Sequence, residues 1–75
     1  MSRIFVDISG DIELQDFVHP ENALYVFGKG GTNPIVYKEE EDVVLSVRTP
    51  AEMGHLFPHQ VASIILYDRM NKQWQ

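Results

Sequence analysis

Two segments of the chain carry apolar side chains at consecutive positions, and this pattern limits the fold more than any other feature. They are the run Ala23 to Phe27, ALYVF, and the run Asp42 to Arg48, DVVLSVR. A strand with one face in water alternates apolar and polar residues, whereas a strand covered on both faces does not. Because parallel sheets usually have both faces covered, these runs predict two strands of a parallel sheet in an α/β fold.

Three further elements complete the predicted fold. Arg3 to Ile8, RIFVDI, is rich in β-branched and aromatic residues and ends at the turn signal Ser9-Gly10, so we expect a first strand. Leu14 to Val18 is expected to form one short turn of helix. A final helix is expected from Pro58 to Lys72, because proline suits the first helical position and apolar residues follow at helical spacing. The sequence therefore predicts one small three-layer domain over residues 1–75, with a mostly parallel, three-stranded sheet and a C-terminal helix.

Length and composition narrow the class of protein. A chain of 75 residues buries only about 60% of the surface that its unfolded form exposes, so self-association would add stability. The absence of cysteine excludes disulfides and cysteine zinc sites. No apolar stretch approaches the roughly 18 residues needed to span a bilayer, and Met1-Ser2-Arg3 does not open a signal peptide. We expect a cytoplasmic protein with no membrane partner.

Acidic residues outnumber basic ones by 11 to 6, which gives a net charge of −5. Glu39-Glu40-Glu41-Asp42 concentrates this charge, and the run is expected to form a solvated turn. Nucleic-acid binding depends largely on neutralising phosphates with Lys and Arg. The chain is therefore expected to hold RNA weakly on its own.

The segment FGKGGTNP, residues 27–34, is the one glycine-rich loop directly after a predicted strand. Its spacing matches neither a Walker A loop nor the GxGxxG dinucleotide fingerprint. Glycine lets a backbone approach a ligand closely, but it also lets a backbone simply turn. Spacing alone leaves both interpretations open, a ligand-contacting loop and a tight structural turn.

The remaining reactive side chains do not form a recognisable site. His55 and His59 are four residues apart, but Pro58 lies between them, so no metal site is predicted from the histidines. Ser9, Ser46 and Ser63 lack the flanking residues of an activated serine. A hydrolase is therefore a poor interpretation.

The order of several short segments is more specific than any one of them. Along the chain these are FVHP at 17–20, VFG at 26–28, LSVRTP at 45–50, LFPHQ at 56–60 and LYDR at 66–69. In this order and spacing the chain resembles the C-terminal half of the SPOUT methyltransferases, in particular the SpoU (TrmH-like) group. The resemblance covers nearly the whole chain.

This resemblance implies a parallel sheet that ends in a trefoil knot, with the final helix threaded through an earlier loop. It also implies a pocket for S-adenosylmethionine beside a homodimer interface, and methyl transfer to RNA, often to a ribose 2′-hydroxyl. Gly28, Val47 and Leu56 match the family positions that contact the cofactor through main-chain groups. The dimer is expected to form through the C-terminal helix, and the glycine loop would be the knot loop beside the cofactor.

The departures from the family pattern leave two hypotheses. The glutamate expected shortly after FG is missing, Gln60 stands where the family usually has asparagine, and the N-terminal half with its activating arginine has no counterpart. The chain is expected to be a cofactor-pocket module with little or no activity alone. The alternative is an active RNA 2′-O-methyltransferase that works as a dimer or with a partner supplying the N-terminal half. Arg48 is the one arginine placed to replace the activating group, unless it is merely solvated or salt-bridged.

Overall fold

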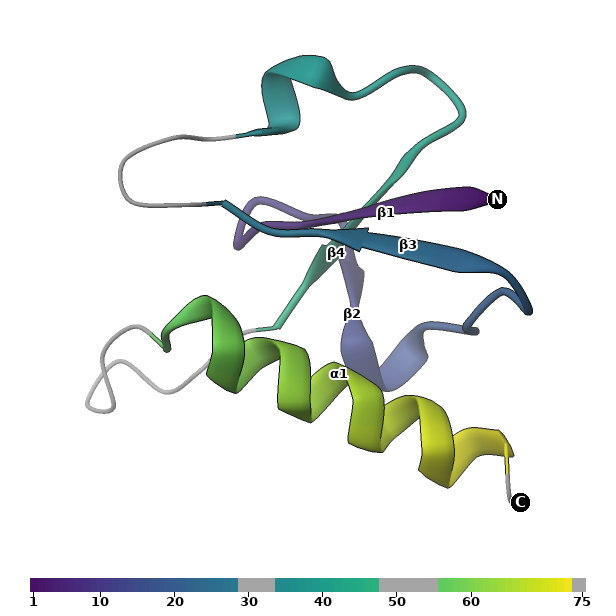
Figure 1. Cartoon of the computed structure of the whole chain (residues 1–75). Helices are drawn as coiled ribbons and strands as arrows, with labels where there is room; N and C mark the ends of the chain where they lie inside the picture. Colours follow the sequence, from purple (N-terminus) through teal and green to yellow (C-terminus); the bar gives the residue numbers. More distant parts are fainter. Residues whose placement is uncertain (29–33, 48–55, 74–75) are drawn as a thin grey trace.

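The fold is a four-stranded parallel sheet with one long helix packed against it (Figure 1). The structure is a computed structural model, and it describes residues 1–28, 34–47 and 56–73. Its elements are, in chain order, β1 (Ser2–Val6), β2 (Ile12–Glu13), the 3₁₀ turn η1 (Leu14–Asp16), β3 (Ala23–Val26), the 3₁₀ turn η2 (Pro34–Tyr37), β4 (Val43–Ser46) and α1 (Pro58–Gln73).

The strands lie in the order β2-β4-β1-β3, and every neighbouring pair is parallel. The first strand of the chain is therefore central. Ile4 of β1 is paired with Tyr25 of β3 on one side and with Val43 of β4 on the other. The two continuous apolar runs flank this central strand, which agrees with the parallel sheet predicted from them.

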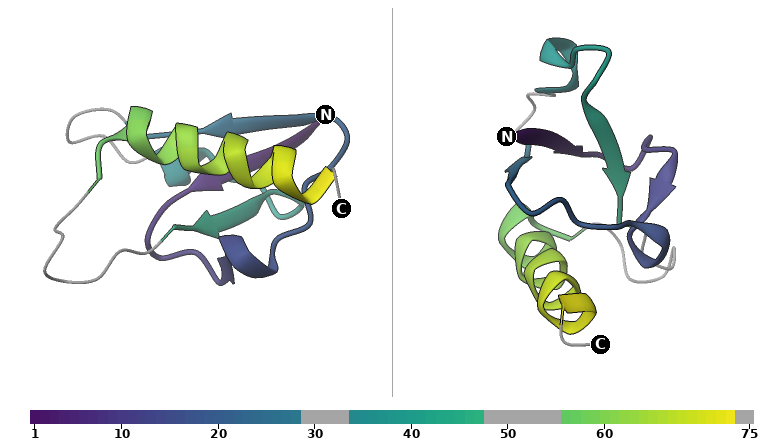
Figure 2. Two further views of the ribbon diagram at one scale, coloured as in Figure 1. Left: turned by 90° about the horizontal axis from the view of Figure 1, so that it is seen from below. Right: turned by 90° about the vertical axis from the view of Figure 1, so that its right-hand side faces the viewer.

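The core lies between the sheet and α1, which runs along one side of the sheet (Figure 2). Ile4 of β1, Leu45 of β4 and Ile65 of α1 are fully or almost fully buried and belong to one cluster with Phe17. Burying a side chain the size of Ile65 contributes about 1.5–3 kcal/mol. One face of α1 is thus held by the core, and its opposite face is left to solvent.

The loop after β1 passes very close to β4. Gly10 donates its N–H to the carbonyl of Asp7 at 3.0 Å, which closes the turn predicted at Ser9-Gly10. A Cβ added to Gly10 would lie 2.7 Å from the carbonyl oxygen of Val44. Glycine is required here because only a residue without a side chain allows this approach.

The structure corrects several details of the predicted fold. The sheet has a fourth strand, β2, which is too short to leave a sequence pattern. The described residues form two layers, the sheet and α1, where three layers were expected. The loops that the predicted knot requires include residues 29–33 and 48–55, which lie outside the described residues.

The acidic run forms a turn, but its last residue is not solvated. The N–H of Asp42 donates to the carbonyl of Glu39 at 3.1 Å, as a turn requires. The side chain of Asp42 is buried and accepts a hydrogen bond from Arg3 Nη2 at 2.5 Å. The bonds from Arg3 and from the Glu39 N–H hold the pKa of Asp42 below its usual range. Asp42 therefore ties the turn before β4 to β1, a role that a charge count does not reveal.

Candidate functional site

The carboxyl edge of the sheet brings two of the predicted cofactor positions together. Parallel strands end at the same edge, where Val47 directly follows β4 and Gly28 follows β3 after Phe27. Phe5 of β1 is registered with Val26 of β3 and with Val44 of β4. Two strand spacings therefore separate β3 from β4, which amounts to roughly 10 Å. Gly28 and Val47, both half-buried, flank the end of β1 across this width.

The strand order reverses at this edge. The chain leaves β1, forms the edge strand β2 on one side of it, crosses to form β3 on the other side, and then returns past β1 to form β4 between β1 and β2. In open α/β sheets, ligands bind outside the carboxyl ends of the strands at such a switch point. The geometry of the backbone thus favours a ligand at the edge where Gly28 and Val47 lie.

Leu56, the third predicted position, stands just before α1 and is half-buried. The next residue, Phe57, is the N-cap residue that directly precedes α1. Its N–H donates to the side-chain oxygen of Gln60 at 2.8 Å, and its carbonyl accepts the N–H groups of Gln60 and Val61 at 3.0 and 3.1 Å. Gln60 therefore caps the helix in the manner of a capping box. The candidate catalytic residue, Arg48, lies outside the described residues.

The segments FVHP and LYDR, far apart in the sequence, contact each other through a partly buried polar network. His19 lies between Tyr25 and Asp68, with its Nδ1 2.6 Å from the Tyr25 hydroxyl and its Nε2 2.7 Å from Asp68 Oδ2. Because a carboxylate only accepts, His19 donates from Nε2, and a neutral ring then accepts the tyrosine hydroxyl at Nδ1. The side chain of His19 is 4% exposed, whereas those of Asp68 and Lys72 are 21% and 30% exposed, so the network is shielded from water at the histidine and partly open to it at Asp68 and Lys72.

Two cations at the end of α1 extend this network to the backbone. Arg69 donates to the carbonyls of Pro20 and Glu21 at 2.7 and 2.8 Å. Lys72 donates to Asp68 at 2.8 Å and to the carbonyls of Leu14 and Phe17 at 2.7 and 2.8 Å, which uses all three of its donors. These side chains fix α1 against the segment between β2 and β3.

Asp68 is the anionic centre of the network. Burial opposes its ionisation, but the hydrogen bonds from Lys72 and His19 outweigh burial and hold the pKa of Asp68 below its usual range. No buried side-chain nitrogen or oxygen of the described residues lacks a partner. A network so fully satisfied stabilises the fold.

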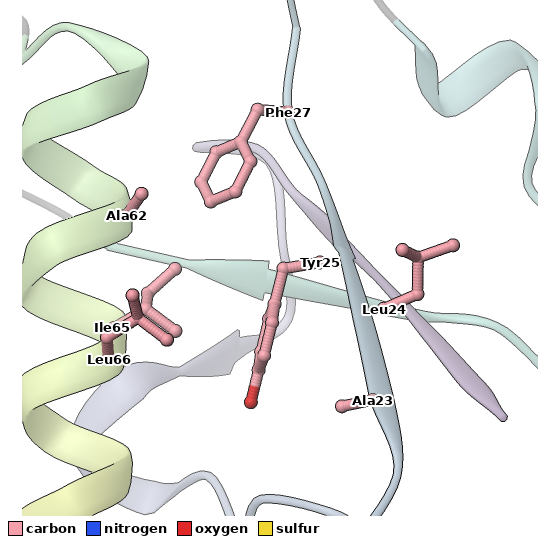
Figure 3. A pocket seen from close by; sticks show the side chains of 7 residues that line it. All are labelled: Ala23, Leu24, Tyr25, Phe27, Ala62, Ile65 and Leu66. Atoms are coloured by element: carbon pink, nitrogen blue, oxygen red, sulfur yellow. The ribbon is translucent and has the colours of Figure 1, made fainter.

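A separate apolar cavity of about 210 Å³ lies between β3 and α1 (Figure 3). Figure 3 shows the rings of Tyr25 and Phe27 on the side of β3 that faces the helix, where Ala62 and Ile65 lie, and Leu24 pointing away. None of the three predicted cofactor positions lines this cavity. The cavity and the carboxyl edge are therefore distinct features.

The sequence places His19, Asp68 and Arg69 in the segments that carry the resemblance and places Lys72 near the end of the helix, but it does not predict their contacts. The i,i+4 spacing of Asp68 and Lys72 is the one signal that local sequence offers. Tyr25 lies six positions from His19. The other partners are more than 40 positions away along the chain, and only the folded chain brings them together.

Comparisons with known protein families, with curated proteins and with solved structures found no match to this chain. No helix in the described part of the chain is long and apolar enough to cross a membrane. Within residues 1–28, 34–47 and 56–73, no three side chains of His, Cys, Asp or Glu gather where they could hold a metal ion.

Proposed function

We propose that this chain is a minimal SPOUT-like module that binds S-adenosylmethionine at the carboxyl edge of its sheet and transfers little or no methyl group alone. The observation that carries this proposal is the reversal of strand order at β1, which favours a ligand site where Gly28 and Val47 lie. The proposal includes the trefoil knot, with α1 passing through an earlier loop.

Two further observations support the proposal. The positions predicted to contact the cofactor through main-chain groups follow strand ends or precede a helix, where backbone N–H and C=O groups are not all used by regular structure. The segments FVHP and LYDR, which carry the resemblance, contact each other through His19 and Asp68. Their order in the sequence thus reflects one three-dimensional arrangement.

Mapping of backbone amide signals by NMR tests the cofactor site. We expect S-adenosylmethionine to shift the amide signals of Gly28, Val47 and Leu56 in the ¹⁵N-labelled protein. Gly28→Val should abolish the shifts, because a side chain would obstruct the approach of the ligand to the backbone. Asn22→Val, the same new side chain at the amino end of β3, is the matched control and should leave them intact. No shifts at ~1 mM ligand, where even a weak site of about −4 kcal/mol is half filled, would refute the site.

Weak catalysis follows from the same proposal. General-base assistance to a hydroxyl contributes about 10² to 10⁴ in rate, and the family's activating arginine has no counterpart in this chain. We expect incubation with total RNA and methyl-labelled S-adenosylmethionine to give little transfer. Robust transfer that disappears in Arg48→Ala would establish the alternative, an active RNA methyltransferase.

The homodimer belongs to this proposal as well. The face of α1 opposite the core carries the solvent-exposed apolar side chains of Ile64, Tyr67 and Met70. Leu66, which also lines the cavity beside β3, is exposed at the edge of this face. Burial of this face against a second copy would remove it from solvent. We propose α1 as the dimer interface.

A further inference from the structure

β3 is an edge strand, and one row of its backbone groups faces away from the sheet. It stands last in the strand order β2-β4-β1-β3. On its inner side, Ser2 of β1 donates its N–H to the carbonyl of Asn22 at 3.1 Å. Because backbone groups of successive strand residues point to opposite sides, Ala23 and Tyr25 direct their N–H and C=O groups outward. Within residues 1–28, 34–47 and 56–73 no strand pairs with them, so they can bond with a strand from outside.

The outer edge of β3 lacks the features that usually prevent such pairing. Edge strands are commonly protected by charged side chains, by proline or by a bulge. The run Ala23 to Phe27 has no charged residue and no proline, and β3 pairs with β1 without a bulge. Leu24, which points away from α1 in Figure 3, is 49% exposed. An apolar edge of this kind favours association through the strand.

Apolar surface continues from this edge onto α1. The residues that line the cavity of about 210 Å³ all come from the run Ala23 to Phe27 and from α1, and none comes from the central strands (Figure 3), so the cavity lies beside the outer edge. Leu66 lines the cavity and is 54% exposed, and Met70, one turn along α1, is 46% exposed. The outer edge of β3 is thus continuous with the face of α1 proposed as a dimer interface.

We propose that β3 of this chain pairs with β3 of a second copy, so that the two sheets join into one. A two-fold axis relates the identical edges and makes the two strands antiparallel. Their outward N–H and C=O groups then bond with each other, and the two α1 helices lie on the same face of the joined sheet. The inference rests on the homodimer of the proposed function and gives its interface a second element.

The run Ala23 to Phe27 is complementary to itself in this arrangement. When the whole run overlaps, Tyr25 lies opposite Tyr25 of the second copy, Leu24 opposite Val26, and Ala23 opposite Phe27. Each side chain therefore meets an apolar or aromatic one, and no like charges face each other. The cavity beside Ala23 leaves room for the ring of Phe27, since an apolar cavity of about 150 Å³ holds benzene. This match favours self-pairing over pairing with an unrelated strand.

Proline at an outward position tests the pairing. Ala23→Pro removes an N–H that faces the second copy and none that bonds to β1, so we expect the fold to remain. At ~100 μM, far above the Kd of a specific dimer, light scattering should give a dimer mass for the parent and a monomer mass for Ala23→Pro. Glu40→Pro is the matched control and should remain dimeric. Glu40 is the second residue of the turn that the Asp42 N–H closes on Glu39, where proline is favoured.

Amide hydrogen exchange adds a readout that is specific to the edge. In the parent dimer, the amide of Tyr25 should exchange about tenfold or more slowly than in Ala23→Pro, because pairing removes it from water. The amide of Val26 faces β1, so it should be protected in both proteins, which verifies folding. Leu24→Lys is a second variant and should also be monomeric. Leu24 is exposed, and the new charge would face Val26 of the second copy.

The outcomes separate this inference from the homodimer on which it rests. A parent dimer whose Tyr25 amide exchanges as fast as in Ala23→Pro means that the copies meet through α1 alone, which overturns the pairing of β3 and keeps the homodimer. Dimer masses for both Ala23→Pro and Leu24→Lys overturn the pairing as well. A monomer mass for the parent refutes the homodimer and the pairing together. A dimer mass for Tyr67→Glu with a protected Tyr25 amide supports β3 and refutes the face of α1.

Discussion

Gly10 shows how a single missing side chain permits the fold. Any Cβ at this position would meet the backbone of β4 at 2.7–2.9 Å, where real Cβ atoms do not occur. We expect Gly10→Ala to lower the free energy of unfolding by about 1–3 kcal/mol, as overpacking does. Urea denaturation measures this, with the exposed Asp11→Ala as a control that changes stability by less than about 0.5 kcal/mol. Equal stability of Gly10→Ala and the parent would show that the loop does not press on β4.

The charge of Asp68 contributes to the docking of α1 through its contact with His19. Asp68→Asn keeps the shape but removes the acceptor charge facing His19 and Lys72, so we expect a loss of about 1.5–3 kcal/mol at neutral pH. The folded-state pKa of Asp68 lies below the usual 3.8. The stabilisation that ionised Asp68 gives to the folded state is therefore complete above the usual pKa of 3.8, and it is lost as the pH falls through the lower, folded-state pKa.

Thermal unfolding at several pH values checks both statements about Asp68. The parent should lose stability below about pH 4, and the difference between the parent and Asp68→Asn should shrink in the same range. Asp16→Asn, an identical change at an exposed carboxylate, should have little effect at any pH. A stability difference between the parent and Asp68→Asn that stays constant down to pH 2 would contradict an ionised Asp68 in the native state.

At the scale of elements, Lys72 connects the end of α1 to η1. It donates to the carbonyl of Leu14, which also accepts the N–H of Phe17 at 3.1 Å within the 3₁₀ turn. We expect Lys72→Met to loosen this turn, so that hydrogen exchange at the Phe17 amide accelerates more than exchange in the middle of α1. Gln73→Met, at an exposed neighbouring position, is the control. Unchanged exchange at Phe17 would mean that Lys72 does not hold the turn.

Elements were predictable where a local pattern encodes them. The strands around Ala23–Val26 and Val43–Ser46 follow from continuous apolar runs. The start of the helix at Pro58 follows from the preference of proline for the first helical position. The two-residue strand β2 has no such pattern, because its pairing with β4 depends on a partner distant in sequence. The burial of Asp42 and the contacts of His19 also depend on partners distant in sequence, so the sequence alone does not predict them. The reversal at β1 that supports the candidate site is likewise a property of strand order.

At the scale of the whole molecule, the exposed face of α1 governs assembly. Tyr67 is 68% exposed and Leu66 54% exposed, which is unfavourable for large apolar groups gathered on one face. We expect a homodimer mass by light scattering at ~100 μM, far above the Kd of a specific dimer. Tyr67→Glu should give a folded monomer, and Gln15→Glu on η1 should remain dimeric. A monomer mass for the parent protein would contradict assembly through α1.

The central position of β1 also has a consequence for folding kinetics. Ser2 is paired with Ala23, Ile4 with Val43, and Ile12 with Leu45, so no described strand pair is closed by a hairpin. Each pairing requires closure of a long loop before any stabilising contact forms, which slows folding. Stopped-flow refolding should show a relaxation of about a millisecond or longer, and a microsecond relaxation would contradict it. During synthesis β1 emerges before the other described strands, yet it can pair with β4, the second of its two neighbours in the sheet, only after Ser46 has left the ribosome.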